Sequence, residues 1–212
     1  MAEEWFRSPD WSPQAQEAFE QRLSRARGSS RSQYLRIKAL ALIGAGGKAE
    51  AKGARELLVR VIETYPESGD VVMAHEHLAE LDVREGHRSP AAAHYRLALR
   101  LAPERHVYGD AALRLPELLI EDGGDNGCRE AREVLDGITP SDLVFASQRF
   151  RYAVARARLA RAAGNKAEAR QHAEDALREA ARDSPDFPRH PTVGLVGANR
   201  KVTKEMRELA RP

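Results

Sequence analysis

Cysteine, long apolar runs and leader-like features are scarce or absent in this chain of 212 residues. Cys128 is the only cysteine, so an internal disulfide is impossible and nothing demands an oxidising compartment. No apolar run approaches the roughly 20 residues of a membrane-spanning helix. The N-terminal sequence MAEEWFRSPDW also lacks the basic and apolar regions of a signal peptide. We therefore expect a cytoplasmic protein that makes no contact with a membrane.

An excess of one charge is missing too. The chain has 34 Lys and Arg against 32 Asp and Glu, a net charge of +2, and the charges are interspersed. Binding to nucleic acid needs clustered cations that displace counterions, so we expect no nucleic-acid partner. Lysine itself is rare: six of the 34 basic residues are lysine and 28 are arginine. Together with the many alanines, this indicates a GC-rich, bacterial coding bias.

Residues that could carry chemistry do not form a recognisable constellation. His75 and His77 lie two apart, on diverging sides of a helix, whereas a helical zinc pair needs a spacing of three or four. His77 and Glu80 do have that spacing, but one histidine with one carboxylate is a weak signal, and we expect solvated side chains. Cys128 has no histidine nearby, and the glycine-rich stretch 123–127 lacks the lysine and hydroxyl of a phosphate loop. We predict no catalytic residues, no metal and no cofactor.

The stretch 72–103 shows how the chain is organised. Leu78 and Ala79 fit a first helix that Gly86 breaks, and a second helix ends at Pro103. In the second helix Ala91, Tyr95, Ala98 and Leu99 recur at helical spacing. The pattern resembles a tetratricopeptide repeat, a helix–turn–helix unit of about 34 residues in which small residues let two helices approach closely.

Two independent markers repeat along the rest of the chain. Glycines that break the helices lie 39, 37 and 41 residues apart, at Gly47, Gly86, Gly123 and Gly164. Alanines suited to close packing lie 37, 40 and 38 residues apart, at Ala54, Ala91, Ala131 and Ala169. The repeats are therefore degenerate and longer than those of the family, and they cover about residues 32–182. Because one helix pair cannot bury its apolar face alone, stacking must supply a continuous core.

These patterns predict an all-α fold, a right-handed α-solenoid of about four antiparallel helix pairs. Residues 1–31 would form an aromatic segment and a capping helix, 32–183 the repeat domain, and 184–212 a proline-rich extended segment with a short capping helix. The expected helices cover residues 13–27, 32–45, 49–65, 107–122, 128–136, 141–163, 166–182 and 199–209, and within 72–103 a first helix is broken at Gly86 and a second ends at Pro103.

Both ends of the chain carry exposed-looking apolar residues. Trp5, Phe6 and Trp11 are expected to pack over the first helices as a lid, and the alternative is an exposed docking motif. In the tail, we expect Phe187, Val193, Leu195 and Val196 to fold back and cap the last repeat. The open alternatives are that the tail inserts into the groove as a built-in ligand or reaches a second subunit.

The family resemblance also implies where a partner would bind, because the first helix of each pair lines the concave groove. The groove positions are then Arg36, Ile43, Met73, Glu76, Glu80, Arg84, Asp110, Leu113, Glu117, Arg151 and Arg158. Some tetratricopeptide proteins clamp a partner's terminal carboxylate with lysines, arginine and asparagines on the first helices of their repeats. The only asparagines here, Asn126, Asn165 and Asn199, lie in turns or the tail, so the resemblance implies no such clamp.

We therefore expect a non-catalytic scaffold or adaptor that binds a protein or peptide along this concave face. One alternative is a regulatory or immunity-type bacterial module that neutralises a single partner protein. Another is an enzyme, or an accessory subunit of one, that uses His77 and Glu80.

Overall fold

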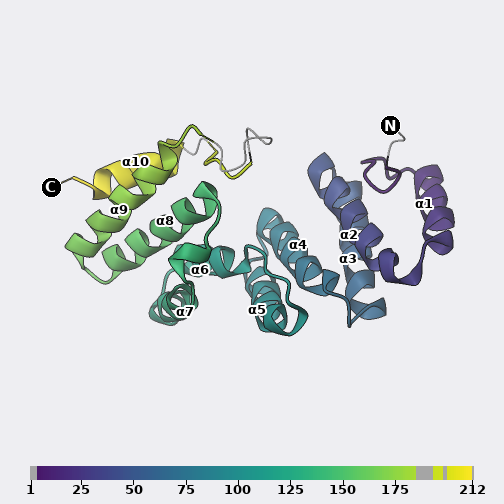
Figure 1. Cartoon of the computed structure of the whole chain (residues 1–212), viewed down its shortest axis with the longest axis horizontal. Coiled ribbons are helices and arrows are strands. Elements are labelled where there is room, and N and C mark those ends of the chain that lie inside the picture. Colours follow the sequence, from purple (N-terminus) through teal and green to yellow (C-terminus); the bar gives the residue numbers. More distant parts are fainter. Residues whose placement is uncertain (1–3, 185–192, 198–199, 212) are drawn as a thin grey trace. The chain divides into compact units, whose positions relative to one another are not determined.

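The computed structural model describes residues 4–184, 193–197 and 200–211. Within these ranges the chain forms ten α-helices, one short 3-10 turn and no strand (Figure 1), so the predicted all-α fold is confirmed. The helices are α1 (Pro13–Arg25), α2 (Gly28–Ala45), α3 (Lys48–Thr64), α4 (Asp70–Glu85), α5 (Arg88–Arg105), α6 (Ala111–Asp122), α7 (Asp125–Asp136), α8 (Ala146–Ala162), α9 (Lys166–Ala180) and α10 (Arg200–Leu209), with the 3-10 turn at Pro140–Asp142.

The helices fall into two compact units, Met1–Ala111 and Ala112–Pro212. In the first unit α2 packs on α3 and α4 packs on α5, and in the second unit α8 packs on α9. Three pairs of helices that follow each other through a short turn are therefore packed together, which is compatible with a helical repeat. Among the described residues, no helix has both the length and the apolar character needed to cross a bilayer.

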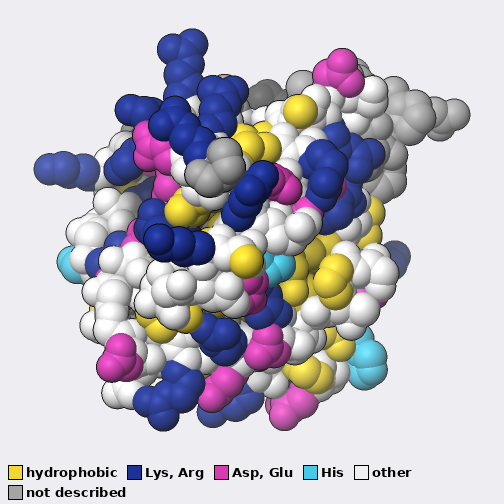
Figure 2. All heavy atoms as spheres, turned by 90° about the vertical axis from the view of Figure 1, so that its left-hand side faces the viewer, with side chains coloured by type: hydrophobic (Ala, Val, Ile, Leu, Met, Phe, Trp, Pro, Cys, Tyr) yellow, Lys and Arg dark blue, Asp and Glu magenta, His cyan; other side chains and the backbone are white. Residues whose placement is uncertain are grey.

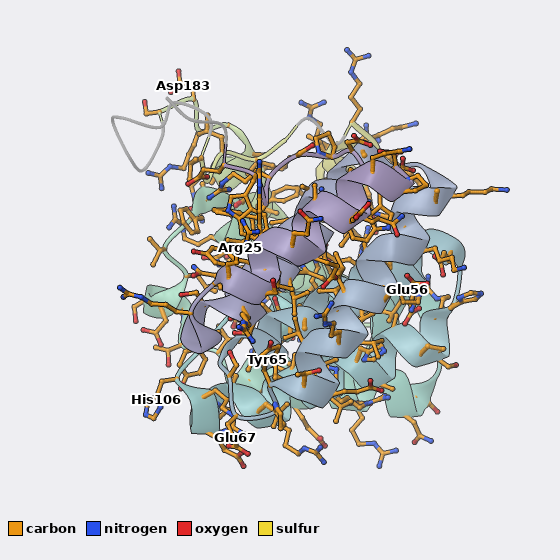
Figure 3. The ribbon with its side chains drawn as sticks, turned by 90° about the vertical axis from the view of Figure 1, so that its right-hand side faces the viewer. Arg25, Glu56, Tyr65, Glu67, His106 and Asp183 are labelled. Atoms are coloured by element: carbon orange, nitrogen blue, oxygen red, sulfur yellow. The ribbon has the colours of Figure 1, made fainter. Side chains whose placement is uncertain are left out.

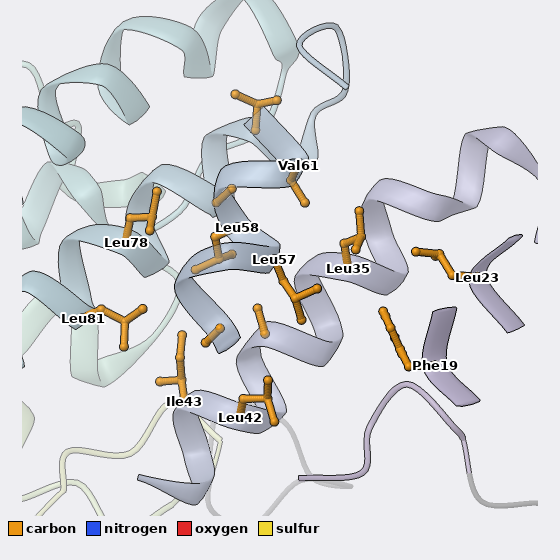
Figure 4. Packing of buried hydrophobic residues seen from close by; sticks show 14 residues of the cluster. Phe19, Leu23, Leu35, Leu42, Ile43, Leu57, Leu58, Val61, Leu78 and Leu81 are labelled. Carbon is orange, nitrogen blue, oxygen red and sulfur yellow. The ribbon is translucent and has the colours of Figure 1, made fainter. Parts of the chain in front are cut away.

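The core of the first unit is built from leucines at helical spacing. Leu35 and Leu42 of α2 meet Leu58 of α3 and Leu78 of α4, and all four are almost completely buried (Figure 4). Phe19 projects from α1 into the same cluster, where α1 lies over the α2–α3 pair (Figure 3). Burying one such side chain stabilises the folded state by about 1.5–3 kcal/mol. The cluster is therefore a major source of the stability of the first unit.

The N-terminal aromatics form the lid that the sequence predicts. Trp5 lies 5.2 Å from Phe19 and 5.2 Å from Tyr34, measured between ring centroids, and Phe6 stacks on Tyr34 at 4.8 Å. Trp11 meets Phe19 edge-on at 6.0 Å. All three lid residues are half-buried against the core, which rules against an exposed docking motif.

A buried lysine fastens this lid. The Lys38 side chain projects from α2, and the residue is only 2% exposed. Its Nζ donates hydrogen bonds to the backbone carbonyls of Ser8 at 2.7 Å and Asp10 at 2.9 Å. The ammonium also lies 5.3 Å from the centre of the Trp11 ring, within the range of a cation–π contact. Burial lowers the pKa of Lys38, and the Asp10 carboxylate opposes that change.

Small residues occupy the positions that the repeat pattern assigns to them. The close-packing alanines Ala54, Ala91, Ala131 and Ala169 are all buried, with at most 3% exposed. Three of the break glycines, Gly86, Gly123 and Gly164, adopt positive φ angles at or next to helix ends. In the first repeat the prediction is off by one residue. Gly46 takes the left-handed conformation, with φ of 76°, and Gly47 precedes the first turn of α3.

Two helix starts differ from prediction because arginine side chains hold the preceding backbone. We expected residues 28–30 to be a loop, yet α2 begins at Gly28. Arg31 donates to the carbonyls of Ala26 at 3.1 Å and Ser24 at 2.8 Å, which closes the end of α1 within a short turn. Before α8, Arg149 donates to the carbonyls of Leu143 and Val144, so the helix begins at Ala146 instead of residue 141.

Pro103 does not end its helix, contrary to the prediction. It lies inside the last turn of α5, which continues to Arg105. Pro116 lies within α6, as it does in the predicted helix 107–122. The start of α6 was also wrong, since the helix begins at Ala111 instead of residue 107.

The second unit has a core of alanines that α10 completes. Ala157 of α8 and Ala173 and Ala176 of α9 are fully buried, and Met206 of α10 joins them with no exposed surface. α10 packs chiefly on α9, as the predicted cap requires. Phe150 and Val154 of α8 belong to the same cluster, so the Met206 side chain packs against both large and small residues.

The extended part of the tail agrees with prediction only in part. The backbone N–H of Ser147 donates to the carbonyl of Gly194 at 2.8 Å, and Val196 packs on the core of the second unit. Val193 is 42% exposed, so its expected burial was wrong. Phe187 lies outside the described residues.

Candidate functional site

A pocket of about 410 Å³ lies in the second unit, between α6, α8, α10 and residues 195–197. Arg114, Arg151 and Arg158 give the pocket its character, and we call it the arginine pocket. Its full lining is Arg114, Glu117, Glu121, Ser147, Phe150, Arg151, Val154, Arg158, Leu195, Val196, Gly197 and Val202.

Helical spacing explains why these side chains meet. On α6, Arg114, Glu117 and Glu121 lie three and four residues apart, which places them on one face. On α8, Arg151 and Arg158 lie seven apart, two turns along one face, with apolar residues beside them. The pocket therefore has a charged wall from α6 and a mixed wall from α8.

Glu117 is the central carboxylate of the pocket. Its Oε2 lies 3.6 Å from Nη1 of Arg114 and 3.7 Å from Nη1 of Arg151, so both are ion pairs but too long for strong hydrogen bonds. Burial raises the pKa of the Glu117 carboxyl, and the charges of Arg151 and Arg114 oppose that rise. The two arginines are thus only partly neutralised by their own chain.

Two arginine nitrogens in the pocket lack acceptors. Nε of Arg114 and Nη1 of Arg151 are buried and donate no hydrogen bond to any described residue. A buried donor without an acceptor costs about 1–3 kcal/mol, and more when the group is charged. Because neither atom has appreciable exposed surface, a carboxylate from a partner reaches it once the guanidinium turns toward the pocket, and guanidinium groups bind carboxylates with well-matched geometry.

Arg158 is held differently, by the capping helix. Its Nη2 donates to Glu205 of α10 at 2.8 Å, and Arg161 lies 3.1 Å from the same carboxylate. Burial raises the pKa of Glu205, but the hydrogen bonds and positive charges of Arg158 and Arg161 together outweigh burial, so the pKa lies below its usual value. Figure 2 shows the side of the molecule that lies on the left in Figure 1, and Lys and Arg side chains gather over the upper part of that view.

The structure brings three of the predicted groove residues together in this pocket. They are Glu117, Arg151 and Arg158. Sequence reasoning missed Arg114 and Glu121, although their spacing from Glu117 on α6 is the signal that could have found them. Leu113, also predicted for the groove, is 3% exposed and belongs to the core.

The groove residues predicted in the first unit mostly make internal contacts. Arg36 pairs with Asp70 at 2.7 Å, and Arg84 donates to the carbonyl of Ile43 at 3.0 Å. Ile43 itself is only 4% exposed. Met73, Glu80 and Asp110 are half-buried and line none of the pockets described here.

Glu76 is the clearest of these internal residues. It is 6% exposed, and its carboxylate accepts hydrogen bonds from the backbone N–H groups of Ala111 at 2.9 Å and Asp110 at 3.3 Å. Gly109 makes room for it, because a Cβ at that position would lie 2.1 Å from Oε2 of Glu76. This residue therefore fixes the backbone near 110 and is not a groove surface.

The histidines of α4 are buried, so the prediction that they are solvated was wrong. His75 and His77 are each 7% exposed. Nδ1 of His75 lies 3.0 Å from Nδ1 of His94 on α5, which is a hydrogen bond between two rings. Burial, with the charges of His94 and Arg100, lowers the pKa of His75 to about 4. Nδ1 of His77 lies 3.9 Å from Oε2 of Glu80, the residue with which the enzyme alternative pairs it.

A further group at the end of α4 has the composition of a metal site. Ligand atoms of Asp82, Glu85 and His87 lie within 4.8 Å of one another. However, Nη2 of Arg55 lies 2.8 Å from both Asp82 and Glu85, so one guanidinium bridges the two carboxylates and offsets one of their two negative charges. No protein-family model matches this chain, and no curated protein matches it either.

Proposed function

We propose that this chain is a non-catalytic scaffold of tetratricopeptide-like, right-handed solenoid type that binds a segment of a protein partner. Consecutive packed helix pairs and the alanines buried at repeat intervals support this proposal. A helical repeat exposes broad helix faces, which suit extended peptides better than small substrates. A protein partner also fits the interspersed charges, which lack the basic tract that nucleic acid requires.

The arginine pocket is the proposed binding site. The observation that carries it is the pair of buried donors, Arg114 Nε and Arg151 Nη1, that lack acceptors in the described structure. Phe150 and Val154 supply apolar surface beside them. When the Glu205 carboxylate on Arg158 and its second partner Arg161 are counted, four arginines face three glutamates and leave one excess positive charge, so the preferred segment carries a carboxylate next to an apolar side chain.

Selection from a phage-displayed library of random peptides tests this proposal. We expect the full-length chain to enrich peptides in which Asp or Glu adjoins an apolar residue. A synthetic peptide of the enriched sequence should bind an Arg114→Ala, Arg151→Ala double variant at least about tenfold more weakly, a loss of about 1.4 kcal/mol. Arg178→Ala is the matched control, since that side chain is 69% exposed on α9 and lies outside the pocket.

Two outcomes would overturn the proposal. One is a selection that enriches no sequence family. The other is an enriched peptide whose affinity does not change in the double variant. If affinity purification with mass spectrometry instead recovers one full-length protein at a ratio of one to one, the function is that of a regulator dedicated to that partner.

A further inference from the structure

The exposed side of α10 carries a regular row of cations. Successive members lie four, three and four residues apart, and they are Arg200, Lys204, Arg207 and Arg211. Because a helical turn takes about 3.6 residues, this spacing places all four within about 60° of one another around the helix axis. All four residues are exposed, and the Lys204 side chain is 79% exposed. We call this row the basic stripe.

The stripe follows one line along the helix and slightly past its end. The backbone N–H of Ala210, the residue after α10, donates to the carbonyl of Met206 at 2.9 Å. The N–H of Arg211 likewise donates to the carbonyl of Glu208 at 3.4 Å, so Arg211 continues the helical path. At a rise of about 1.5 Å per residue, the stripe is roughly 16 Å long.

Core packing turns the stripe outward. Met206 is completely buried, and Val202 and Leu209 are partly buried on the core of the second unit. These three apolar positions lie on the side of the helix opposite the stripe. Figure 1 labels α10 near the C-terminal end, and Figure 2, which faces that side of the molecule, shows Lys and Arg side chains gathered over its upper part.

The carboxylates of α10 itself do not cancel the stripe. Its three arginines form no ion pair with any residue that the structure describes. Lys204 has one partner, Glu208, at 4.0 Å, and that pair is exposed and therefore weak. The other carboxylate, Glu205, is turned away from the stripe and is already bound by Arg158 and Arg161.

The helices beneath α10 do not supply the missing negative charge either. α8 has five arginines and no carboxylate, and three of the four carboxylates of α9 already pair with arginines. Residues 146–184 and 200–211 together contain 14 Lys and Arg against seven Asp and Glu. Three of the surplus cations pair with carboxylates of α6 and α7, namely Arg151 with Glu117, Arg156 with Asp136 and Arg158 with Glu121. An excess of four positive charges remains.

The surroundings of the stripe favour a protein as its anionic partner. A helix that binds a lipid surface inserts apolar side chains beside its cations, but those of α10 are turned into the core. Nucleic acid is bound by a broad field of cations, whereas this stripe is a single row with Glu208 beside it.

We propose that the basic stripe docks an acidic helix of a partner protein, in which carboxylates alternate at spacings of four and three residues. Neighbouring cations of the stripe are separated along the axis by about 6 and 4.5 Å, and a partner helix repeats at the same distances. Side chains on one face of an extended segment repeat at about 6.7 Å and fall out of step. The stripe is separate from the arginine pocket, because none of its residues lines that pocket.

A titration of the nitrogen-15-labelled full-length chain with two synthetic peptides tests the proposal. Both are alanine-rich helices of roughly 20 residues, long enough to form in water. One carries four glutamates at the spacing of the stripe, and the other carries the same glutamates distributed around the helix. At about 20 mM salt the first peptide should shift the amide signals of α10 and bind at least about threefold more tightly than the second. Binding should weaken strongly at about 0.5 M salt, because exposed charges are then screened.

Matched variants locate the contact. Lys204→Gln with Arg207→Gln should weaken binding of the first peptide by at least about threefold. Lys166→Gln with Arg178→Gln removes the same charge from exposed positions of α9 and should leave the affinity nearly unchanged. The Arg114→Ala, Arg151→Ala double variant should also bind this peptide normally, which separates the stripe from the arginine pocket. Circular dichroism should show that every variant is folded.

Three results would overturn the proposal. Equal affinity for the two peptides would show that the spacing of the stripe is not read. Equal losses in the α9 and α10 variants would show a general attraction of charge. A single-stranded oligonucleotide, or a vesicle of anionic phospholipid, that binds more tightly than the first peptide at the same salt concentration would assign the stripe to a different partner.

Discussion

The two ends of the described chain cover their apolar surfaces in different ways. At the N-terminal end three aromatic residues share the task, and the buried cation of Lys38 fastens them to α2. At the C-terminal end a single helix, α10, covers a core of alanines with one fully buried side chain, Met206. The first cover is therefore distributed over several partly buried rings, whereas the second depends chiefly on one fully buried side chain, with Val202 and Leu209 of α10 partly buried beside it.

The largest expected effect follows from that dependence. Met206→Ala should destabilise the second unit by about 2–5 kcal/mol, since the alanines around Met206 cannot close the cavity. Denaturant unfolding followed by circular dichroism measures the loss. Glu208→Ala on the same helix is the control, because its side chain is 55% exposed and should change stability little. Equal losses in the two variants would show that α10 does not depend on Met206.

An intermediate effect tests close packing in the first unit. Ala91→Leu should cost about 1–3 kcal/mol, because it overpacks the contact between α4 and α5. The neighbour Ala92 is itself only 5% exposed and therefore makes a poor control. Ala93 is exposed, so Ala93→Leu should cost much less. Denaturant midpoints that fall equally in both variants would contradict the register of this helix pair.

The smallest effect is a response to acid that should be confined to the first unit. The pKa of His75 lies near 4 in the folded chain and near 6.5 when unfolded, so the unfolded state binds the proton first and stability falls as pH decreases between these values. Between pH 7 and 5.5 the loss should be about 1 kcal/mol. Hydrogen exchange should show α4 and α5 loosening while α8 and α9 do not.

Around His75 the neighbouring groups are His94 on α5, with Asp82 and Arg55 beyond it, and Arg100. His75→Gln should remove much of the acid response, whereas His87→Gln, at an exposed position, should keep it. Acid sensitivity that persists unchanged in His75→Gln would assign the response to other groups.

The sequence predicted more of the fold than of the candidate site. Helical periodicity and the spacing of glycines located the helix pairs, and the alanines at repeat intervals are buried as expected, because both signals are local. The burial of His75 and Glu76 was missed, since it depends on His94 and on backbone at 110–111, which only the folded chain brings near. The arginine pocket was found in part, because helical spacing places Arg151 and Arg158 on one face but does not fix which α6 residues oppose them.

The central claim, that the arginine pocket takes an anionic peptide segment, has a direct spectroscopic test. In nitrogen-15 NMR spectra, Nε–H of Arg114 should report a buried donor without an acceptor. Addition of the library-selected acidic peptide should shift the Arg114 Nε–H proton downfield as it gains a hydrogen bond, and saturation should follow the binding curve. An Arg114 Nε–H signal that stays unchanged while the peptide binds would contradict the claim.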